Sequence, residues 1–156
     1  MKYVSLKRLC VVAVLFGLGA CATEEPGGIE ASVSRAELDV DPAMPEARAE
    51  LDVTVEVLTR GQPEDVTLEA VVIHELPLAD DSDSITFVPQ LVNPQGDDPI
   101  VRLVAGEEIV LRVLNAGTTN EELSPWCNRP VQLAVTLATA SGAEAEATQD
   151  ISVRCP

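Results

Sequence analysis

An alternation of apolar and polar residues, repeating every two positions, runs through most of this chain from residue 29 onward. The clearest example spans residues 51–57, where apolar residues occupy every second position: Leu51, Val53, Val55 and Val57. Successive side chains of a β-strand point to opposite faces, so this pattern predicts a strand with one buried face. Residues 66–72, 109–113 and 131–137 repeat the pattern and are predicted as three further strands.

Weaker segments fill the gaps between these strands. In residues 29–40 the apolar positions change parity, and a β-bulge or strand break near Ser34–Arg35 explains the change. Ile85–Val88 and Ile100–Val104 are short apolar candidates for strands, each followed by turn-forming residues. Ala143–Gln149 is predicted as a strand or, because Ala and Glu favour helices, as a short helix.

Short strands joined by turns of Gly, Pro, Asn and Asp are typical of antiparallel sandwiches. We therefore predict an all-β domain over residues 29–156, an antiparallel β-sandwich of about seven or eight strands. In strand number and turn spacing this domain resembles the immunoglobulin-like sandwich modules of bacteria. The resemblance implies an immunoglobulin-like fold, but sandwiches host many functions and it implies none in particular.

The first twenty residues have the composition of a leader. Lys2, Lys7 and Arg8 are basic, Leu9–Leu18 is almost wholly apolar, and small residues precede Cys21. This order predicts a secretory signal peptide over residues 1–20 that is cleaved from the mature chain. The apolar run is shorter than the ~20 residues that a membrane-spanning helix needs.

The end of the leader carries a more specific motif. Leu18-Gly19-Ala20-Cys21 resembles the lipobox of bacterial lipoproteins. The resemblance implies that Cys21 becomes the first mature residue and carries acyl chains such as palmitate, which anchor the protein to a membrane. Ala22 stands where an inner-membrane lipoprotein carries aspartate, which implies the outer membrane, on its periplasmic or its surface face. Residues 21–28 then form a lipidated tether; the alternative is a plain secreted protein.

The net charge of the chain limits the classes of partner that it is expected to bind. The formal net charge is −16, and without residues 1–20 it becomes −19, because seven arginines then face all twenty-six acidic residues. Phosphate contacts need Lys and Arg, so we predict no nucleic-acid partner. A basic partner or divalent cations would be attracted instead.

Two cysteines remain in the mature domain besides Cys21. If Ala140–Gly142 is a three-residue hairpin loop with Gly142 in the left-handed conformation, Thr139 faces Ala143. The same register then places Cys127 opposite Cys155. Export permits oxidation, so we predict a Cys127–Cys155 disulfide worth about 3 kcal/mol, with Trp126 covering it or the rim of the core.

The sequence offers little catalytic chemistry. It contains no Gly-x-Ser-x-Gly elbow, no phosphate-binding glycine loop and no Cys-x-x-Cys motif. The single histidine, His74, ends an apolar strand and is predicted to be a hydrogen-bonded residue at the sheet rim. We therefore predict no enzymatic activity and no cofactor, with a carboxylate enzyme acting on envelope polymers as the alternative.

One acidic loop suggests a metal ion. Asp80, Asp81 and Asp83 cluster around Ser82, and Asp97-Asp98 follow Gly96. Calcium takes several oxygen ligands, so these aspartates are candidate calcium ligands, although their spacing departs from the EF-hand pattern. The alternative is a solvated, charged turn.

These observations together predict a non-catalytic lipoprotein of the bacterial cell envelope. Its acidic sandwich would serve protein interaction or envelope assembly; a calcium-dependent adhesion or ligand-binding module is the alternative function. Four apolar residues off the core-facing parity are predicted as edges of a partner surface or, alternatively, as buried in the other sheet or under a loop: Leu58, Val71, Ile73 and Leu114.

Overall fold

The computed structural model describes residues 28–96 and 98–156. The predicted signal peptide, the lipidation site Cys21, most of the predicted tether and Asp97 lie outside the described residues.

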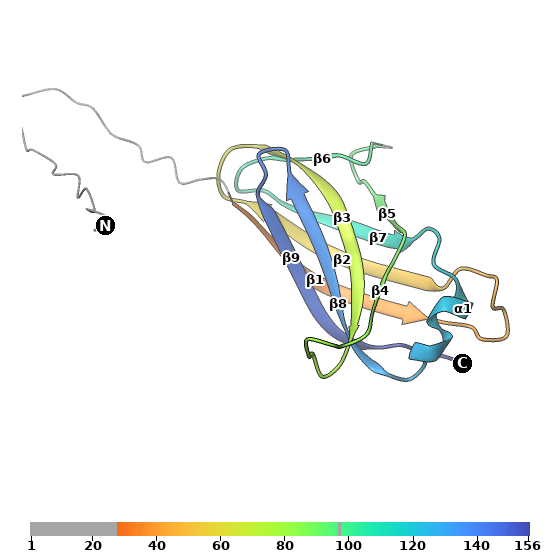
Figure 1. The fold of residues 1–156 in the computed structure, drawn as a ribbon. Coiled ribbons are helices and arrows are strands. Elements are labelled where there is room, and N and C mark those ends of the chain that lie inside the picture. The colour runs from red at the N-terminus through yellow and green to blue at the C-terminus, as the bar shows by residue number, and fades with distance from the viewer. Residues whose placement is uncertain (1–27, 97) are drawn as a thin grey trace, which may run out of the picture.

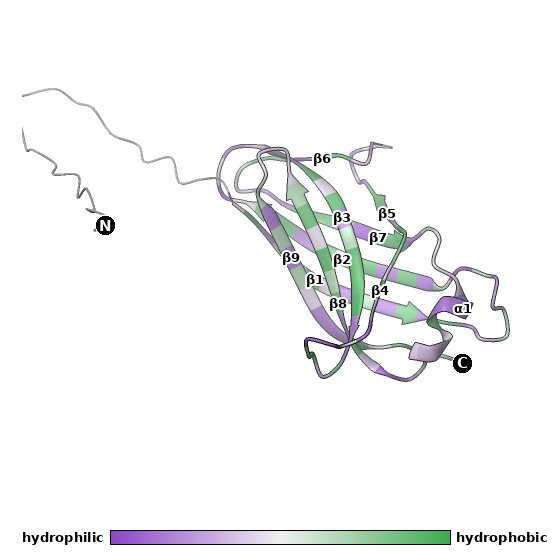
Figure 2. Cartoon of the chain, viewed as in Figure 1, coloured by the Kyte–Doolittle hydropathy of each residue, from purple (hydrophilic) through white to green (hydrophobic). Residues whose placement is uncertain are grey.

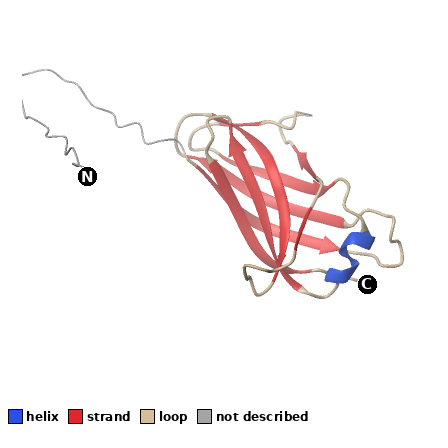
Figure 3. Cartoon of the chain, in the orientation of Figure 1, coloured by secondary structure: helices blue, strands red, loops and turns tan. Residues whose placement is uncertain are grey.

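Two antiparallel sheets pack face to face as a β-sandwich, which confirms the predicted fold class (Figures 1 and 3). The first sheet has the order β1-β2-β7-β5. Its strands are β1 (Ile29–Asp39), β2 (Glu50–Thr59), β7 (Glu108–Asn115) and β5 (Pro89–Val92). The second sheet has the order β4-β3-β8-β9, and β6 pairs with β3 on the same edge as β4. Its strands are β3 (Glu64–Glu75), β4 (Ser84–Thr86), β6 (Val101–Leu103), β8 (Pro130–Thr139) and β9 (Glu144–Ser152).

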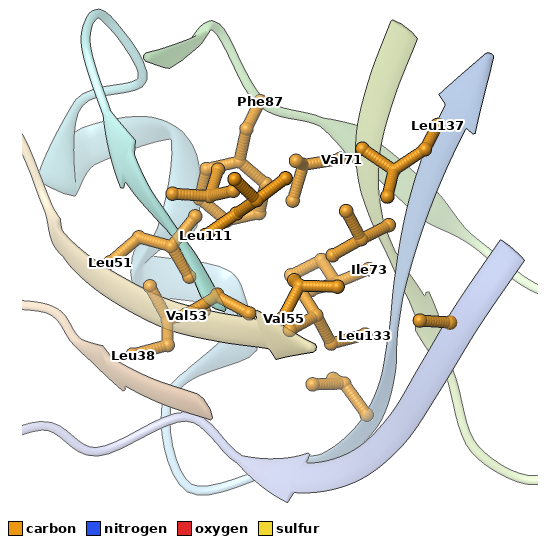
Figure 4. Packing of buried hydrophobic residues seen from close by; sticks show 14 of the residues in the cluster. Leu38, Leu51, Val53, Val55, Val71, Ile73, Phe87, Leu111, Leu133 and Leu137 are labelled. Carbon is orange, nitrogen blue, oxygen red and sulfur yellow. The ribbon is translucent and has the colours of Figure 1, made fainter. Parts of the chain in front are cut away.

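The core consists of aliphatic side chains from the facing sides of the two sheets. In β2 the predicted alternation holds throughout, with the four apolar residues buried between partly exposed polar ones. Figure 4 shows side chains of the two sheets meeting, and Figure 2 shows the alternation along the strands. Phe87 and Trp126 are the aromatic residues of this core, exposed by only 3% and 8%.

A bulge in β1 confirms the predicted parity change. Val33 pairs with Val55 and Arg35 pairs with Thr54, so Ser34 is the extra residue on β1. The extra residue turns the following side chains to the opposite face, which brings Leu38 into the core.

A second bulge, in β3, changes which residues of this strand face the core. Leu68 pairs with Leu137 and Ala70 with Thr136, so Glu69 is the extra residue. Beyond it the opposite parity faces the core, and Val71 and Ile73 are fully buried. The predicted partner surface through Val71 and Ile73 is therefore wrong, and the alternative of burial between the sheets is correct for both.

The other two residues of that predicted surface lie on the outer face of the first sheet. Leu58 and Leu114 are half-buried there, Leu58 opposite Glu108 and Leu114 opposite Asp52. They are separated by the length of the β2–β7 pairing, so they do not form a common apolar patch.

The β8–β9 hairpin has the predicted register. Pro130 pairs with Ser152 and Ala138 with Glu144, and the pairing runs unbroken between them. Gly142 has φ of 87°, the left-handed conformation that the three-residue loop requires. Residues 144–149 lie within β9, so the strand is correct for this segment and the short helix is wrong, because Ala147 packs into the core.

The predicted strand Ile85–Val88 is divided between the two sheets. Phe87 donates its backbone N–H to Val71 of the second sheet, whereas the Val88 carbonyl accepts from Ala116 beside the first. The chain therefore crosses the sandwich at this point, and β5 begins at Pro89. Proline is tolerated there because β5 is an edge strand. The predicted strand Ile100–Val104 is present as β6, and the division at Phe87–Val88 makes nine strands in the described part of the chain.

The two ends of the sandwich carry different segments. We call the end next to Gly28 the proximal end and the opposite end the distal end. At the proximal end, the backbone N–H of Gly106 donates to the Thr59 carbonyl at 2.7 Å. The buried Thr59 hydroxyl lies 3.5 Å from the Gly28 carbonyl, the first described residue. The distal end carries α1 (Asn120–Leu123), the 3₁₀ turn η1 (Ser124–Trp126) and the last residues of the chain (Figure 1).

Candidate functional site at the distal end of the sandwich

The connection between β1 and β2, residues 40–49, packs against the residues that begin α1. Ala49 N–H donates to Thr118 O at 3.1 Å, and Asn120 N–H donates to Ala47 O at 2.8 Å. Glu121 N–H donates to Pro45 O at 3.0 Å. These bonds hold the connection in one conformation although it contains no regular secondary structure.

Asn120 is the central polar side chain of this end and is only 2% exposed. Its Oδ1 accepts from Asp41 N at 3.1 Å, and its Nδ2 donates to Met44 O at 2.9 Å. A buried amide satisfied on both sides fixes the loop from within.

A capping box starts α1. The Thr119 hydroxyl accepts from Glu122 N, and the Glu122 carboxylate accepts from Thr119 N at 2.7 Å. The hydrogen bond from the Thr119 backbone holds the pKa of Glu122 below its ordinary value. Thr119-Asn120-Glu121-Glu122 follows the capping-box pattern, so the sequence carries a signal for this helix start, which was not among the predicted elements.

The last residues of the chain lie opposite the β1–β2 connection and form the second wall of a cleft. Val40 N–H donates to Arg154 O at 2.8 Å, and Arg154 N–H donates to Leu38 O at 2.9 Å. The Arg154 guanidinium donates to both carboxylate oxygens of Asp39, each at 2.6 Å. These hydrogen bonds raise the pKa of Arg154, so its charge is fixed.

A disulfide fixes the last residues of the chain to the turn before β8, as predicted. Cys127 and Cys155 are joined, with their Cα atoms 5.6 Å apart. Both half-cystines pack against the core, and Trp126 is buried beside Cys127. The bond therefore ties the end of β9 to the turn that precedes β8.

Between these walls lies a cleft of about 680 Å³. Six of the residues that line it carry its chemistry: Asp39, Asp41, Met44, Arg48, Glu50 and Asn120. A second cleft of about 390 Å³ lies on the outer face of the first sheet and shares Asp39, Arg48 and Glu50 with the first. We call the two together the distal groove.

Salt bridges neutralise part of the charge in the distal groove. Arg112 donates to both carboxylate oxygens of Asp52, at 2.9 and 2.6 Å, and these hydrogen bonds lower the pKa of Asp52. Within residues 28–96 and 98–156, six of the seven arginines pair with a carboxylate: Arg35, Arg60, Arg102, Arg112, Arg129 and Arg154. Arg48, in the groove, is the seventh.

The predicted calcium ligands are not brought together. Asp80, Asp81 and Asp83 are exposed on the loop between β3 and β4, where the Ser82 hydroxyl donates to Pro77 O and accepts from Ala79 N. Asp98 lies in a different loop, where its carboxylate accepts from Ile100 N. In the part of the chain that the structure describes, no three side chains of His, Cys, Asp or Glu are arranged to hold a metal ion.

His74 lies in β3, paired with Ser84 on one side and Gln132 on the other, and is half-buried. No hydrogen bond joins its imidazole to another described residue, so the predicted hydrogen bond is not found, although the position at the sheet rim is correct.

Comparisons with known proteins place the chain in no family. No family model and no curated protein matches it. Among the described residues, no helix is long and apolar enough to cross a membrane.

Two solved structures are similar to it in outline. The sporulation control protein Spo0M of Bacillus subtilis matches with a TM-score of 0.41 and 13% identity over 82% of this chain, which spans 49% of Spo0M. The bacterial hydrophobin BslA matches with a TM-score of 0.30 and 11% identity over 85% of this chain and 98% of BslA.

Proposed function

We propose that this protein is a non-catalytic lipoprotein of the bacterial cell envelope that presents the distal end of its sandwich to another envelope protein. One observation carries the proposal: the start of β1 and the end that carries α1 lie at opposite ends of the domain (Figure 1). Gly28 directly precedes β1, and residues beside α1 line the distal groove. If Cys21 carries the lipid, the groove points away from the membrane.

The dimensions of the domain support this arrangement. The ten residues of β2 span about 33 Å at ~3.3 Å per residue. Residues 22–28 add at most about 25 Å of reach when fully extended. A partner in the periplasm, or at the cell surface, within roughly 60 Å of the bilayer would then meet the distal loops first.

The titratable groups of the described residues support a non-catalytic role. The groups with a displaced pKa are Asp52, Arg112, Glu122 and Arg154. Each is explained by an ion pair or a helix cap, and none faces a nucleophile and a base together.

In-cell photocrosslinking tests the proposal. A photoreactive amino acid replaces Met44 in the distal groove or, as the matched control, Thr148 on the exposed outer face of β9. We expect one dominant envelope protein to be captured at position 44 and not at position 148, and the capture to be lost when Cys21→Ser releases the domain from the membrane. Capture of the same proteins at both positions, or of none at 44, would contradict it.

A further inference from the structure

We infer that the distal groove binds a basic segment of the partner protein, one in which arginine or lysine alternates with apolar residues. The inference rests on the proposed interaction function and names the chemistry of the partner. It depends on three properties of the groove: its shape, its rigidity and its charge.

The shape suits a peptide segment. Its larger cleft, of about 680 Å³, lies within the range of ordinary ligand sites, ~300–1,000 Å³. The second cleft continues it across the outer face of the first sheet, through the residues that both clefts share. Met44 is 57% exposed at the groove, and a flexible thioether accommodates apolar side chains of different shapes.

The rigidity lowers the cost of binding. Asn120 holds the loop from beneath, and the Arg154–Asp39 pair and the disulfide hold the opposite wall. A partner therefore meets a preformed surface and pays little entropy for ordering it.

The charge of the groove selects a cation. Asp39 and Asp52 are already neutralised by Arg154 and Arg112. Asp41 and Glu50 form no ion pair with any described residue, and they outnumber Arg48, which faces the same space. The net charge of −19 without the leader also steers basic partners toward the molecule.

Removal of Arg48 should have opposite effects on the binding of a cationic and of an anionic ligand. It opposes a basic ligand, so its removal strengthens the binding of a cation. If the groove served an anionic ligand instead, Arg48 would be the receptor and its removal would abolish binding. Opposite effects of one substitution thus separate the two ligand classes.

The test uses the full-length chain in a neutral detergent and two labelled peptides, acetylated and amidated so that only side chains carry charge. One peptide alternates leucine with arginine and the other leucine with glutamate. Binding is measured by fluorescence anisotropy for the parent protein, D41N/E50Q, R48Q and E144Q/E146Q. The last variant removes the same charge from the exposed outer face of β9. Asn at position 41 still offers Oδ1 to Ala43 N.

We expect the arginine peptide to bind about tenfold more weakly to D41N/E50Q and about twofold more tightly to R48Q, at physiological salt. E144Q/E146Q should bind within twofold of the parent, because charges beyond ~8 Å are screened there. Three results would overturn the inference: equal weakening in both double variants, binding of the glutamate peptide that R48Q abolishes, or no binding of either peptide. If crosslinking from position 44 succeeds while the peptides fail, the interaction function stands and the ligand class is wrong.

Discussion

At the scale of single residues, a few buried polar groups decide the conformation of the distal end. Asn120, 2% exposed, replaces backbone pairing for the loop that lacks regular structure. Thr59 has a similar place at the proximal end, where its buried hydroxyl lies 3.5 Å from the Gly28 carbonyl and 3.4 Å from the Gln62 carbonyl. Such residues are few because each buried polar atom needs its own partner.

Asn120→Ala is expected to lower the free energy of unfolding by about 2–3 kcal/mol, because it leaves Asp41 N and Met44 O without their buried partner. Urea denaturation measures this loss. The neighbouring exposed Glu121→Ala is the control and should change the free energy by less than about 0.5 kcal/mol. Equal effects of the two substitutions would mean that the buried amide does not hold the loop.

Stability should fall in acid through Asp52 and Glu122. Both carboxyls have a pKa lowered from ordinary values of 3.8 and 4.5, so the folded state favours their charged forms. Their contribution is complete above these values and is lost as the pH falls through the folded-state pKa. Chemical denaturation between pH 6 and about pH 3 should show this decline, and D52N/E122Q should flatten it. An unchanged slope in the double variant would assign the acid sensitivity to other carboxyls.

At the scale of elements, two single-residue bulges set which side of a strand faces the core. Ser34 in β1 and Glu69 in β3 each add one residue against the partner strand. Because the side-chain period of a strand is two, one extra residue reverses the faces of everything beyond it. The burial of Ile73 in the core depends on this reversal.

Deletion of Glu69 is therefore expected to be far more damaging than its substitution. Without the extra residue, either Val71 and Ile73 turn outward or β3 loses its register with β8, so several kcal/mol of core packing are lost. Glu69→Ala keeps the bulge and should cost less than about 1 kcal/mol, since Glu69 is exposed. Thermal unfolding of the two variants measures the contrast; similar melting temperatures would show that β3 tolerates a shifted register.

The β8–β9 hairpin and its disulfide form the second decisive element. Cys127 and Cys155 are separated by 28 positions, and C127A/C155A is expected to lose about 3 kcal/mol through the freer unfolded chain. Denaturation with and without reductant checks this: reductant should destabilise the parent and leave the variant unchanged. A parent protein insensitive to reductant would mean that the two thiols remain free in the isolated protein.

At the scale of the whole molecule, the chain enters the acidic sandwich at one end and the groove lies at the other. The start of β1 follows the predicted tether, and α1 and the last residues lie at the opposite end (Figure 1). The residues that line the groove belong to this second end. The paired strands β1, β2 and β7 connect the two ends, so the position of the groove follows from where the chain enters the domain.

Cys21→Ser should move the protein from the membrane fraction to the soluble fraction, because a domain of net charge −19 has no electrostatic attraction to anionic lipids. Fractionation followed by mass spectrometry of the N-terminal peptide measures this, with an acylated Cys21 expected in the parent. An unmodified N-terminal cysteine on a soluble parent protein would support the plain secreted protein instead.

The local patterns of the sequence determined much of the fold. Alternation identified the buried face of β2, the parity change located the bulge at Ser34, and the loop at Gly142 determined the hairpin register that pairs Cys127 with Cys155. Each of these depends on residues that are neighbours in sequence or across one turn, so short-range geometry was sufficient.

The position of the second bulge and the formation of the groove depend on the tertiary structure. Residues 70–73 are all apolar, so alternation does not reveal where β3 changes its face; packing against β8 and the opposite sheet decides it at Glu69. The groove joins the loop after β1, the start of α1 and the residues after β9. These segments are far apart in sequence, and only the folding of the two sheets onto one core brings them together.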